Sequence, residues 1–172
     1  MLSITSRRVL ATAVLAAVPL FVGAASYANG SKTATFDVTM KIIEDCTIAT
    51  APLDFGQSQG VLATTVTGNT TISVVCTNTT PYNLGLNAGT GTGSNGTTRY
   101  MSGQAAGNTG TVQFNLYQTS GSGVWGNTQG TNTRGGTGSG AAQTITVYGE
   151  VPAQNTPAPD TYRSTITATV YF

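Results

Sequence analysis

Apolar and polar residues alternate over short stretches of this chain, and this period of two restricts its fold more than any other feature. Successive side chains of a β-strand point to opposite faces, so the alternation gathers apolar residues on one face. No stretch after residue 28 keeps the 3.6-residue period of an amphipathic helix. The pattern predicts an all-β fold, and short strands separated by Gly, Pro and Asn clusters favour a β-sandwich.

The most regular alternation covers residues 34–42. Its apolar face consists of Ala34, Phe36, Val38, Met40 and Ile42. Continuing this phase would place Glu44 among the apolar residues, which predicts a break near residues 43–45 before a second strand that carries Cys46. Residues 34–42 are therefore expected to form a strand that is separable from the rest of the domain.

Further strands are predicted at residues 70–76, 82–86, 111–118, 143–151 and 165–172. The last of them alternates Ile166, Ala168, Val170 and Phe172 with polar or amphipathic residues. Most of the 22 glycines lie between Gly85 and Gly140. Because a strand and the apolar pair Val124-Trp125 fall inside this region, we expect long loops and hairpins of one domain rather than a linker.

The amino terminus has the features of a secretory signal peptide. Arg7 and Arg8 precede an apolar run over residues 9–23, and small residues at Ser26 and Ala28 suit cleavage after residue 28. The run is shorter than the roughly 20 apolar residues that a membrane-spanning helix needs. Residues 1–28 are therefore predicted to direct export.

Export gives the two cysteines a specific meaning, because oxidising compartments favour disulfides. Cys46 and Cys76 are the only cysteines, and each lies in phase with apolar neighbours on a predicted strand. Both sulfur atoms should then face the core and bond to each other. Closing a loop of about 30 residues would stabilise the fold by roughly 3 to 4 kcal/mol.

Composition excludes several classes of function. The chain has no histidine, charged residues make up only 8% of it, and its net charge is +1. Catalysis by histidine and metal binding through histidine are therefore excluded. The low net charge also means that nucleic acid is not an expected partner. Glu44 and Asp45 would point to opposite faces of a strand, so a two-carboxylate glycosidase is a weak alternative. A calcium site is a weak alternative as well, because no loop has the dense Asp spacing of such sites. We expect no enzymatic activity and no cofactor.

Strand pairing itself is a candidate function. An all-β domain with an alternating strand at its amino end, tethered by Asn29-Gly30-Ser31, is able to add that strand to the sheet edge of another molecule.

A series of short motifs follows in order along the chain. They are Phe36 to Ile42 leading into Cys46, Leu53-Asp54-Phe55-Gly56, Ile72 to Thr77, Tyr82 to Gly89, Arg99-Tyr100-Met101, Tyr117 with Trp125-Gly126, Val147 to Pro152, and Asp160-Thr161-Tyr162 with Val170-Tyr171-Phe172. In this order and spacing the chain resembles the spore coat U domain proteins, and within them the pilin subunits of archaic, Csu-type chaperone-usher pili.

The resemblance implies an incomplete immunoglobulin-like β-sandwich that lacks its final strand, with one disulfide. In that family a periplasmic chaperone fills the resulting groove with its own strand, and an outer-membrane usher exchanges it for the amino-terminal strand of the next subunit. The resemblance assigns the donor strand to Ala34, Phe36, Val38, Met40 and Ile42, the groove edge to Ile166, Ala168, Val170 and Phe172, and the family's disulfide to Cys46 and Cys76.

The implied organisation is a signal peptide (residues 1–28), a donor segment (29–43) and a spore coat U β-sandwich (44–172). The expected function is that of a pilin subunit in an extracellular fibre for adhesion or biofilm, exported through the periplasm to the cell surface. Its expected partners are neighbouring subunits, a chaperone and an usher. Without residues 1–28 the chain has no room for a second, adhesive domain, so a shaft or adaptor subunit is favoured.

Two other functions stay open from the sequence. One is a spore coat or secreted matrix protein of the same structural class. The other is a secreted carbohydrate-binding module in which Trp125 and Tyr100, beside the glycine-rich loops, stack on a sugar; loop aromatics that cover a core edge are the competing interpretation.

Overall fold

The computed structural model describes residues 29–56 and 60–172. The predicted signal peptide lies outside the described residues. Met40–Phe172 form one compact unit, and residues 29–39 belong to a second unit. The regular structure within the described ranges is entirely β, which confirms the predicted all-β class. Among these residues no helix has the length and apolar character needed to cross a membrane.

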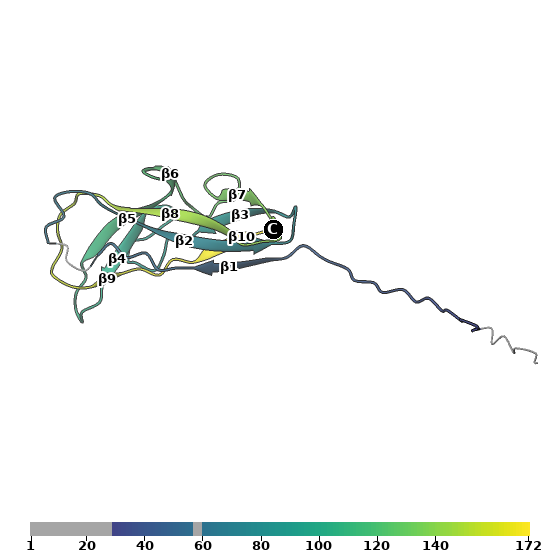
Figure 1. Ribbon diagram of the computed structural model, residues 1–172. Helices are drawn as coiled ribbons and strands as arrows, with labels where there is room; N and C mark the ends of the chain where they lie inside the picture. The colour runs from purple at the N-terminus through teal and green to yellow at the C-terminus, as the bar shows by residue number, and fades with distance from the viewer. Residues whose placement is uncertain (1–28, 57–59) are drawn as a thin grey trace, which may run out of the picture. The chain divides into compact units, whose positions relative to one another are not determined.

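The strands pair antiparallel in two sheets (Figure 1). They are β1 (Cys46–Thr50), β2 (Val66–Cys76), β3 (Pro81–Leu86), β4 (Arg99–Gly103), β5 (Thr111–Thr119), β6 (Ser122–Val124), β7 (Arg134–Thr137), β8 (Gln143–Val151), β9 (Tyr162–Arg163) and β10 (Ala168–Tyr171). The larger sheet has the order β1-β2-β8-β5-β4-β9, with β6 paired to β5. The smaller sheet has the order β10-β3-β7.

The core lies where the predicted apolar faces meet. On β5 the inward residues are Val112, Phe114 and Leu116, as the alternation predicts, and β8 contributes Ile145 and Val147. Alternate residues of both strands are half-buried or exposed. Burial of large apolar side chains at roughly 1.5 to 3 kcal/mol each is the main force that holds these strands together.

Trp125 and Arg99 connect the two sheets through backbone carbonyls. Trp125 has no exposed surface, and its indole Nε1 donates a hydrogen bond to the carbonyl of Leu84 at 2.8 Å. The Arg99 guanidinium is equally buried and donates to the carbonyls of Leu86 at 2.9 Å, Trp125 at 2.6 Å and Asn87 at 3.0 Å. These bonds fix the end of β3 to β4 and to the segment after β6.

Burial lowers the pKa of Arg99 to about 10, so the guanidinium stays protonated at neutral pH. Its charge is satisfied by carbonyl dipoles rather than by a carboxylate. The burial of Trp125 also corrects one expectation: the sugar-stacking role of this residue is wrong, because no ligand reaches a ring inside the core.

Two predicted strands differ in the structure. Residues 34–42 lie in no strand, because among the described residues no other segment pairs with them. The strand predicted at 165–172 pairs only over Ala168–Tyr171, since the amides of Thr165 and Thr167 bond instead to the side chains of Thr90 and Asn87. The strands β4, β6, β7 and β9 were not predicted.

Replacing Arg99 tests the connection between the sheets. In Arg99→Leu, the carbonyls of Leu86, Asn87 and Trp125 lose their buried donor, at a cost of about 1 to 3 kcal/mol for each group. We expect the free energy of unfolding in urea to fall by about 3 kcal/mol or more. Arg163→Leu, at an exposed arginine of β9, should change it by less than about 0.5 kcal/mol. Equal effects of the two substitutions would contradict this role of Arg99.

Candidate functional site

Each of the two sheets ends in a strand that lacks a neighbour on one side. Within residues 29–56 and 60–172, β1 pairs only with β2, and β10 pairs only with β3. Cα atoms of β1 and β10 approach within 8 Å of each other, yet no ladder joins these two strands. The two unpaired edges therefore lie close together, one from each sheet.

The hydrogen bonds on the paired side of each strand show which amides and carbonyls face its unpaired edge. The amide of Asn87 donates to the carbonyl of Thr167 at 3.1 Å, so in an antiparallel strand the alternate residues Ala168 and Val170 direct their amides and carbonyls to the opposite edge. Next to β1, the amide of Ala51 donates to a carbonyl of β2 at 3.1 Å. Because successive residues face opposite edges, the amides and carbonyls of Ile48 and Thr50 face the unpaired edge. An edge of this kind is a template for a further strand.

Apolar side chains lie beside both unpaired edges. Ile48 on β1 and the C-terminal residues Ile166, Ala168 and Val170 are partly buried and pack against the core. Phe172 is 57% exposed. Three of the four predicted groove residues thus contact the core, while Phe172 is mostly exposed.

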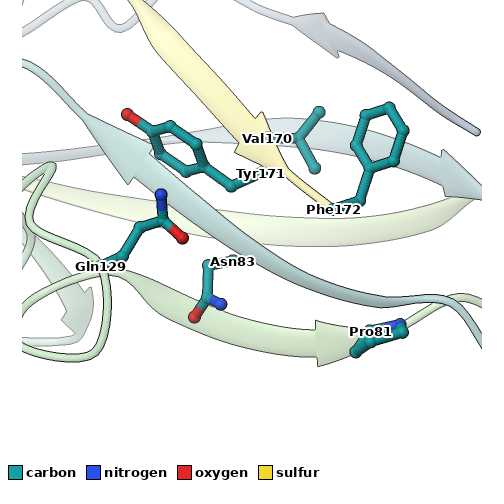
Figure 2. Close-up of a pocket in the computed structure, with 6 residues that line it drawn as sticks. All are labelled: Pro81, Asn83, Gln129, Val170, Tyr171 and Phe172. Carbon is teal, nitrogen blue, oxygen red and sulfur yellow. The ribbon is translucent and has the colours of Figure 1, made fainter.

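The stretch from residue 162 to residue 172 runs between two cavities. The larger, of about 780 Å³, is lined mainly by apolar side chains that include Leu53, Phe55, Leu62, Val66, Met101, Val112, Val151 and Tyr162. The smaller, of about 470 Å³, is lined by Pro81, Asn83, Gln129, Val170, Tyr171 and Phe172 (Figure 2). Figure 2 shows Val170 and Phe172 projecting on the same side of β10. Together the cavities and the stretch between them offer an extended surface in which apolar side chains alternate with polar groups.

Asp160 organises the polar rim of the larger cavity. Its carboxylate accepts hydrogen bonds from the amide of Ala105 at 2.8 Å, from Asn108 Nδ2 at 2.7 Å and from the amide of Thr161 at 2.7 Å. The hydrogen bond from the Ala105 amide is the main cause of a lowered pKa at Asp160, with Asn108 next. The Tyr162 hydroxyl donates to the carbonyl of Ala158 at 2.7 Å and closes the same rim.

The predicted donor residues form an uncovered apolar face. We call residues 34–42 the arm. The large side chains of the arm are 86% exposed at Phe36 and Val38, 88% at Met40 and 73% at Ile42, and Ala34 is exposed as well. Soluble domains rarely expose so many large apolar side chains within one short segment. Such exposure is typical of a surface that binds a partner.

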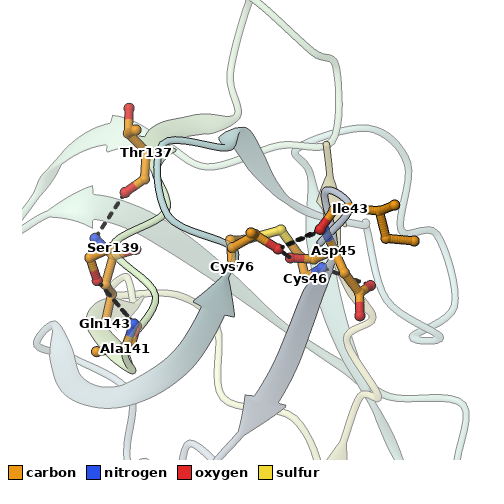
Figure 3. Close-up of a disulfide and its surroundings, with 9 residues drawn as sticks. Ile43, Asp45, Cys46, Cys76, Thr137, Ser139, Ala141 and Gln143 are labelled. Atoms are coloured by element: carbon orange, nitrogen blue, oxygen red, sulfur yellow. Dashed lines mark hydrogen bonds between the residues drawn. A yellow bond between two sulfur atoms is a disulfide. The ribbon is translucent and has the colours of Figure 1, made fainter. Parts of the chain in front are cut away.

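The predicted disulfide is present. Cys46 and Cys76 are bonded with an S–S distance of 2.03 Å, at the first pair of the β1–β2 ladder (Figure 3). Cys76 is buried and Cys46 is half-buried. Among the described residues no group of three or more His, Cys, Asp or Glu side chains is placed to hold a metal ion.

Some residues of the site had no predicted role. Leu53 and Phe55 line the larger cavity although the sequence analysis used them only as part of a family motif. Their spacing of two residues is the one local signal, since it matches the alternation of a strand. Met101 and Tyr162 reach the same cavity from β4 and β9, two short strands that the sequence pattern did not reveal.

The bonds to Asp160 predict a response to acid. The folded-state pKa of Asp160 is lowered from 3.8, so its carboxylate stabilises the turn at residues 104–108 above pH 3.8. This contribution is lost as the pH falls through the folded-state pKa. We expect the amide proton of Ala105 to shift in NMR spectra with a midpoint below 3.8. Asp160→Asn should abolish the titration and Asp54→Asn should leave it unchanged. A midpoint above 3.8 would be inconsistent with these hydrogen bonds.

Known proteins share both the sequence pattern and the fold. The family model of the Spore Coat Protein U domain matches residues 32–169. No curated protein matches the chain. Among solved structures, the chain is similar to one in the crystal structure of the CsuC-CsuE chaperone-tip adhesion subunit pre-assembly complex from archaic chaperone-usher Csu pili of Acinetobacter baumannii.

The structural match has a TM-score of 0.55 at 21% sequence identity, which shows a shared fold. It covers 76% of this chain and 40% of the other, so this chain spans less than half the length of its structural relative. The family model, which describes a domain of a coat protein, points to a structural, non-enzymatic protein. Since the family model covers most of its length, the chain belongs to the Spore Coat Protein U domain family.

Proposed function

We propose that this chain is a structural subunit that polymerises into an extracellular fibre by donor-strand exchange. The arm of one copy fills the space beside β1 and β10 of the next copy. One observation carries the proposal: the same molecule has an uncovered apolar strand face at residues 34–42 and an unpaired, apolar sheet edge at β10. The unpaired edge needs a further strand, and the apolar face of the arm needs an apolar surface to cover it.

The dimensions of the two features agree. As a β-strand, residues 34–42 would extend about 30 Å, at about 3.3 Å per residue. The stretch from residue 162 to residue 172, which runs between the two cavities, has a similar number of residues. Alternate arm side chains would then face the apolar surface, while Asp37 and Lys41 would face water.

The energetics favour a long-lived joint. Burying Phe36, Val38, Met40 and Ile42 contributes very roughly 6 to 12 kcal/mol before the costs of association. Each new backbone hydrogen bond along the edges adds about 1 kcal/mol net. Loss of rotational and translational freedom and ordering of the arm oppose binding. Because the arm is continuous with its own subunit, every joint also links two folded domains.

The hydrogen bonds at residues 43–45 favour exchange between molecules over self-insertion. The Thr77 hydroxyl donates to the carbonyl of Ile43 at 3.0 Å and accepts from the amide of Asp45 at 3.1 Å. The amide of Thr77 donates to the carbonyl of Asp45 at 2.9 Å. A tight reversal that laid the arm along the unpaired edge of its own β1 would break these bonds. The arm is therefore more easily given to a neighbour.

The open edge and the predicted signal peptide support the proposed assembly partners and location. A subunit with such an edge needs a temporary strand before polymerisation, which a periplasmic chaperone supplies and an outer-membrane usher exchanges. The structurally similar chain comes from a chaperone-tip adhesion subunit complex, which supports a chaperone partner. The predicted signal peptide supports export, and the fibre would serve adhesion or biofilm formation at the cell surface.

A spore coat or secreted matrix protein is the second candidate. The description of the family model favours it. Strand exchange would assemble such a layer by the same contacts, so the two candidates differ in where the polymer is found.

Supplying the missing strand within the same chain tests the open edge. We expect the processed subunit alone to aggregate, and a copy of residues 31–43 joined after Phe172 by a flexible linker to give a soluble monomer. Several kcal/mol of net binding should raise its melting temperature by more than about 10 °C. A scrambled copy of the same composition is the control. Equal melting temperatures with both copies would argue strongly against an acceptor edge.

A charge on the apolar face of the arm tests the donor. Val38→Asp should prevent polymerisation, because a carboxylate would be buried without a partner at a cost of several kcal/mol. Thr39→Asp adds the same charge on the opposite face and should leave polymerisation intact. Both variants should bind the chaperone and keep their own domain folded, as measured by circular dichroism. Fibres of normal length from Val38→Asp, seen by electron microscopy, would overturn the donor assignment.

A further inference from the structure

The disulfide lies at the point where the arm enters the folded domain. Residues 43–45, which we call the root, lead directly into Cys46, the first residue of β1. The root is held by Thr77, through the hydroxyl bonds to Ile43 and Asp45 and the amide bond to the carbonyl of Asp45. Cys46 and Cys76 are opposite each other in the register, so the covalent bond closes the first pair of the ladder.

An edge strand is mechanically weak when it is pulled at its end. β1 has five residues, and within the described part of the chain β2 is its only ladder partner. Tension that enters through the arm reaches Cys46 before any other strand residue. Without a covalent bond at this position, the ladder would open pair by pair from the pulled end. With the bond, β1 cannot separate from β2 at that end.

On the other side of the disulfide, β2 and Cys76 are held by β8 and by the loop that precedes it. β2 pairs with β8 from Val66 to Val74, inside the larger sheet. The loop that precedes β8 packs against Cys76: the amide of Gly140 donates to the carbonyl of Cys76 at 3.0 Å, and a side chain at Gly138 would collide with the carbonyl of Thr77. Figure 3 shows the root and this loop on opposite sides of the disulfide. Force that passes through Cys76 is thus distributed into the body of the sheet.

We propose that the Cys46–Cys76 disulfide and the Thr77 hydroxyl form a mechanical clamp, which transmits tension from the arm into the larger sheet without opening β1. The inference rests on the proposed function, because only a fibre joined through arms would place this tension on the root. The free edge of β1 also borders the space for the neighbour's arm. If β1 peeled away, the joint with the next subunit would lose one of its two edges. One clamp therefore protects two consecutive joints.

Single-molecule pulling in two geometries tests the clamp. The protein is the subunit with the arm copy joined after Phe172, compared with its Cys46→Ser, Cys76→Ser variant. In the first geometry the tethers are at residue 29 and at the exposed Ala106, so that force enters through the arm. In the second, tethers at the exposed Ala106 and Ala141 direct the force through β5, β6 and β7 rather than through the arm. Forced unfolding reports the barrier along the pulled direction.

We expect loss of the disulfide to lower the unfolding force about twofold or more when the arm is pulled, and far less in the second geometry. The same protein is measured in both geometries, so a general loss of stability lowers both forces alike. An equal proportional decrease in the two geometries would overturn the clamp and leave the disulfide as an ordinary stabilising crosslink. Failure of the proposed function is seen separately, as an arm copy that does not raise the melting temperature.

The part played by Thr77 has its own test. In oxidised protein, Thr77→Val removes the hydroxyl while keeping the side-chain shape, so hydrogen exchange at the Asp45 amide should quicken by about tenfold or more. Thr47→Val, the same change on the exposed face of β1, should leave that exchange rate unchanged. An unchanged rate in Thr77→Val would remove Thr77 from the clamp.

Discussion

A β-strand satisfies its backbone only when another strand lies beside it, and the open edges of this molecule follow from that constraint. β1 and β10 each have one neighbour among the described residues, and apolar side chains that pack on the core accompany both edges. The arm has the complementary problem, since its large apolar side chains have almost no cover. A polymer in which the arm of each copy pairs with the open edges of the next would cover the apolar arm and satisfy the unpaired edges.

The open edge requires the rest of the domain to be firmly held. Within the described residues β10 has only β3 as a ladder partner, so any movement of β3 would move this unpaired edge. Trp125 and Arg99 oppose such movement by bonding to two carbonyls at the end of β3: that of Leu84, the last residue paired with β7, and that of Leu86 beyond it. The disulfide has the corresponding role for β1. Buried polar contacts at one edge and a covalent bond at the other thus keep both unpaired edges in place.

Sequence reasoning succeeded where a strand pairs and packs within its own chain. β5 and β8 follow their alternation closely, because a half-buried strand needs apolar residues at every second position. At residues 34–42 the pattern describes a strand for which the described residues offer no partner, so the pairing of this segment stays a prediction. Sequence reasoning missed β4, β6 and β7, whose Gly, Ser and Thr residues carry little hydrophobic signal, and β9, which has only two residues. Trp125 was treated as a loop aromatic, since the carbonyl that accepts its N–H comes from a strand 41 residues away.

The central claim is that the arm forms ladders with the unpaired edges, and amide protection measures this directly. A chain that begins at residue 44 would be mixed with a synthetic peptide of residues 31–43, and hydrogen exchange would be followed at Ile48, Thr50, Ala168 and Val170. If the arm pairs along these edges, exchange at these amides slows by orders of magnitude, while amides that already pair within the sheets change little. Unchanged exchange at all four amides in the presence of excess peptide would contradict the claim.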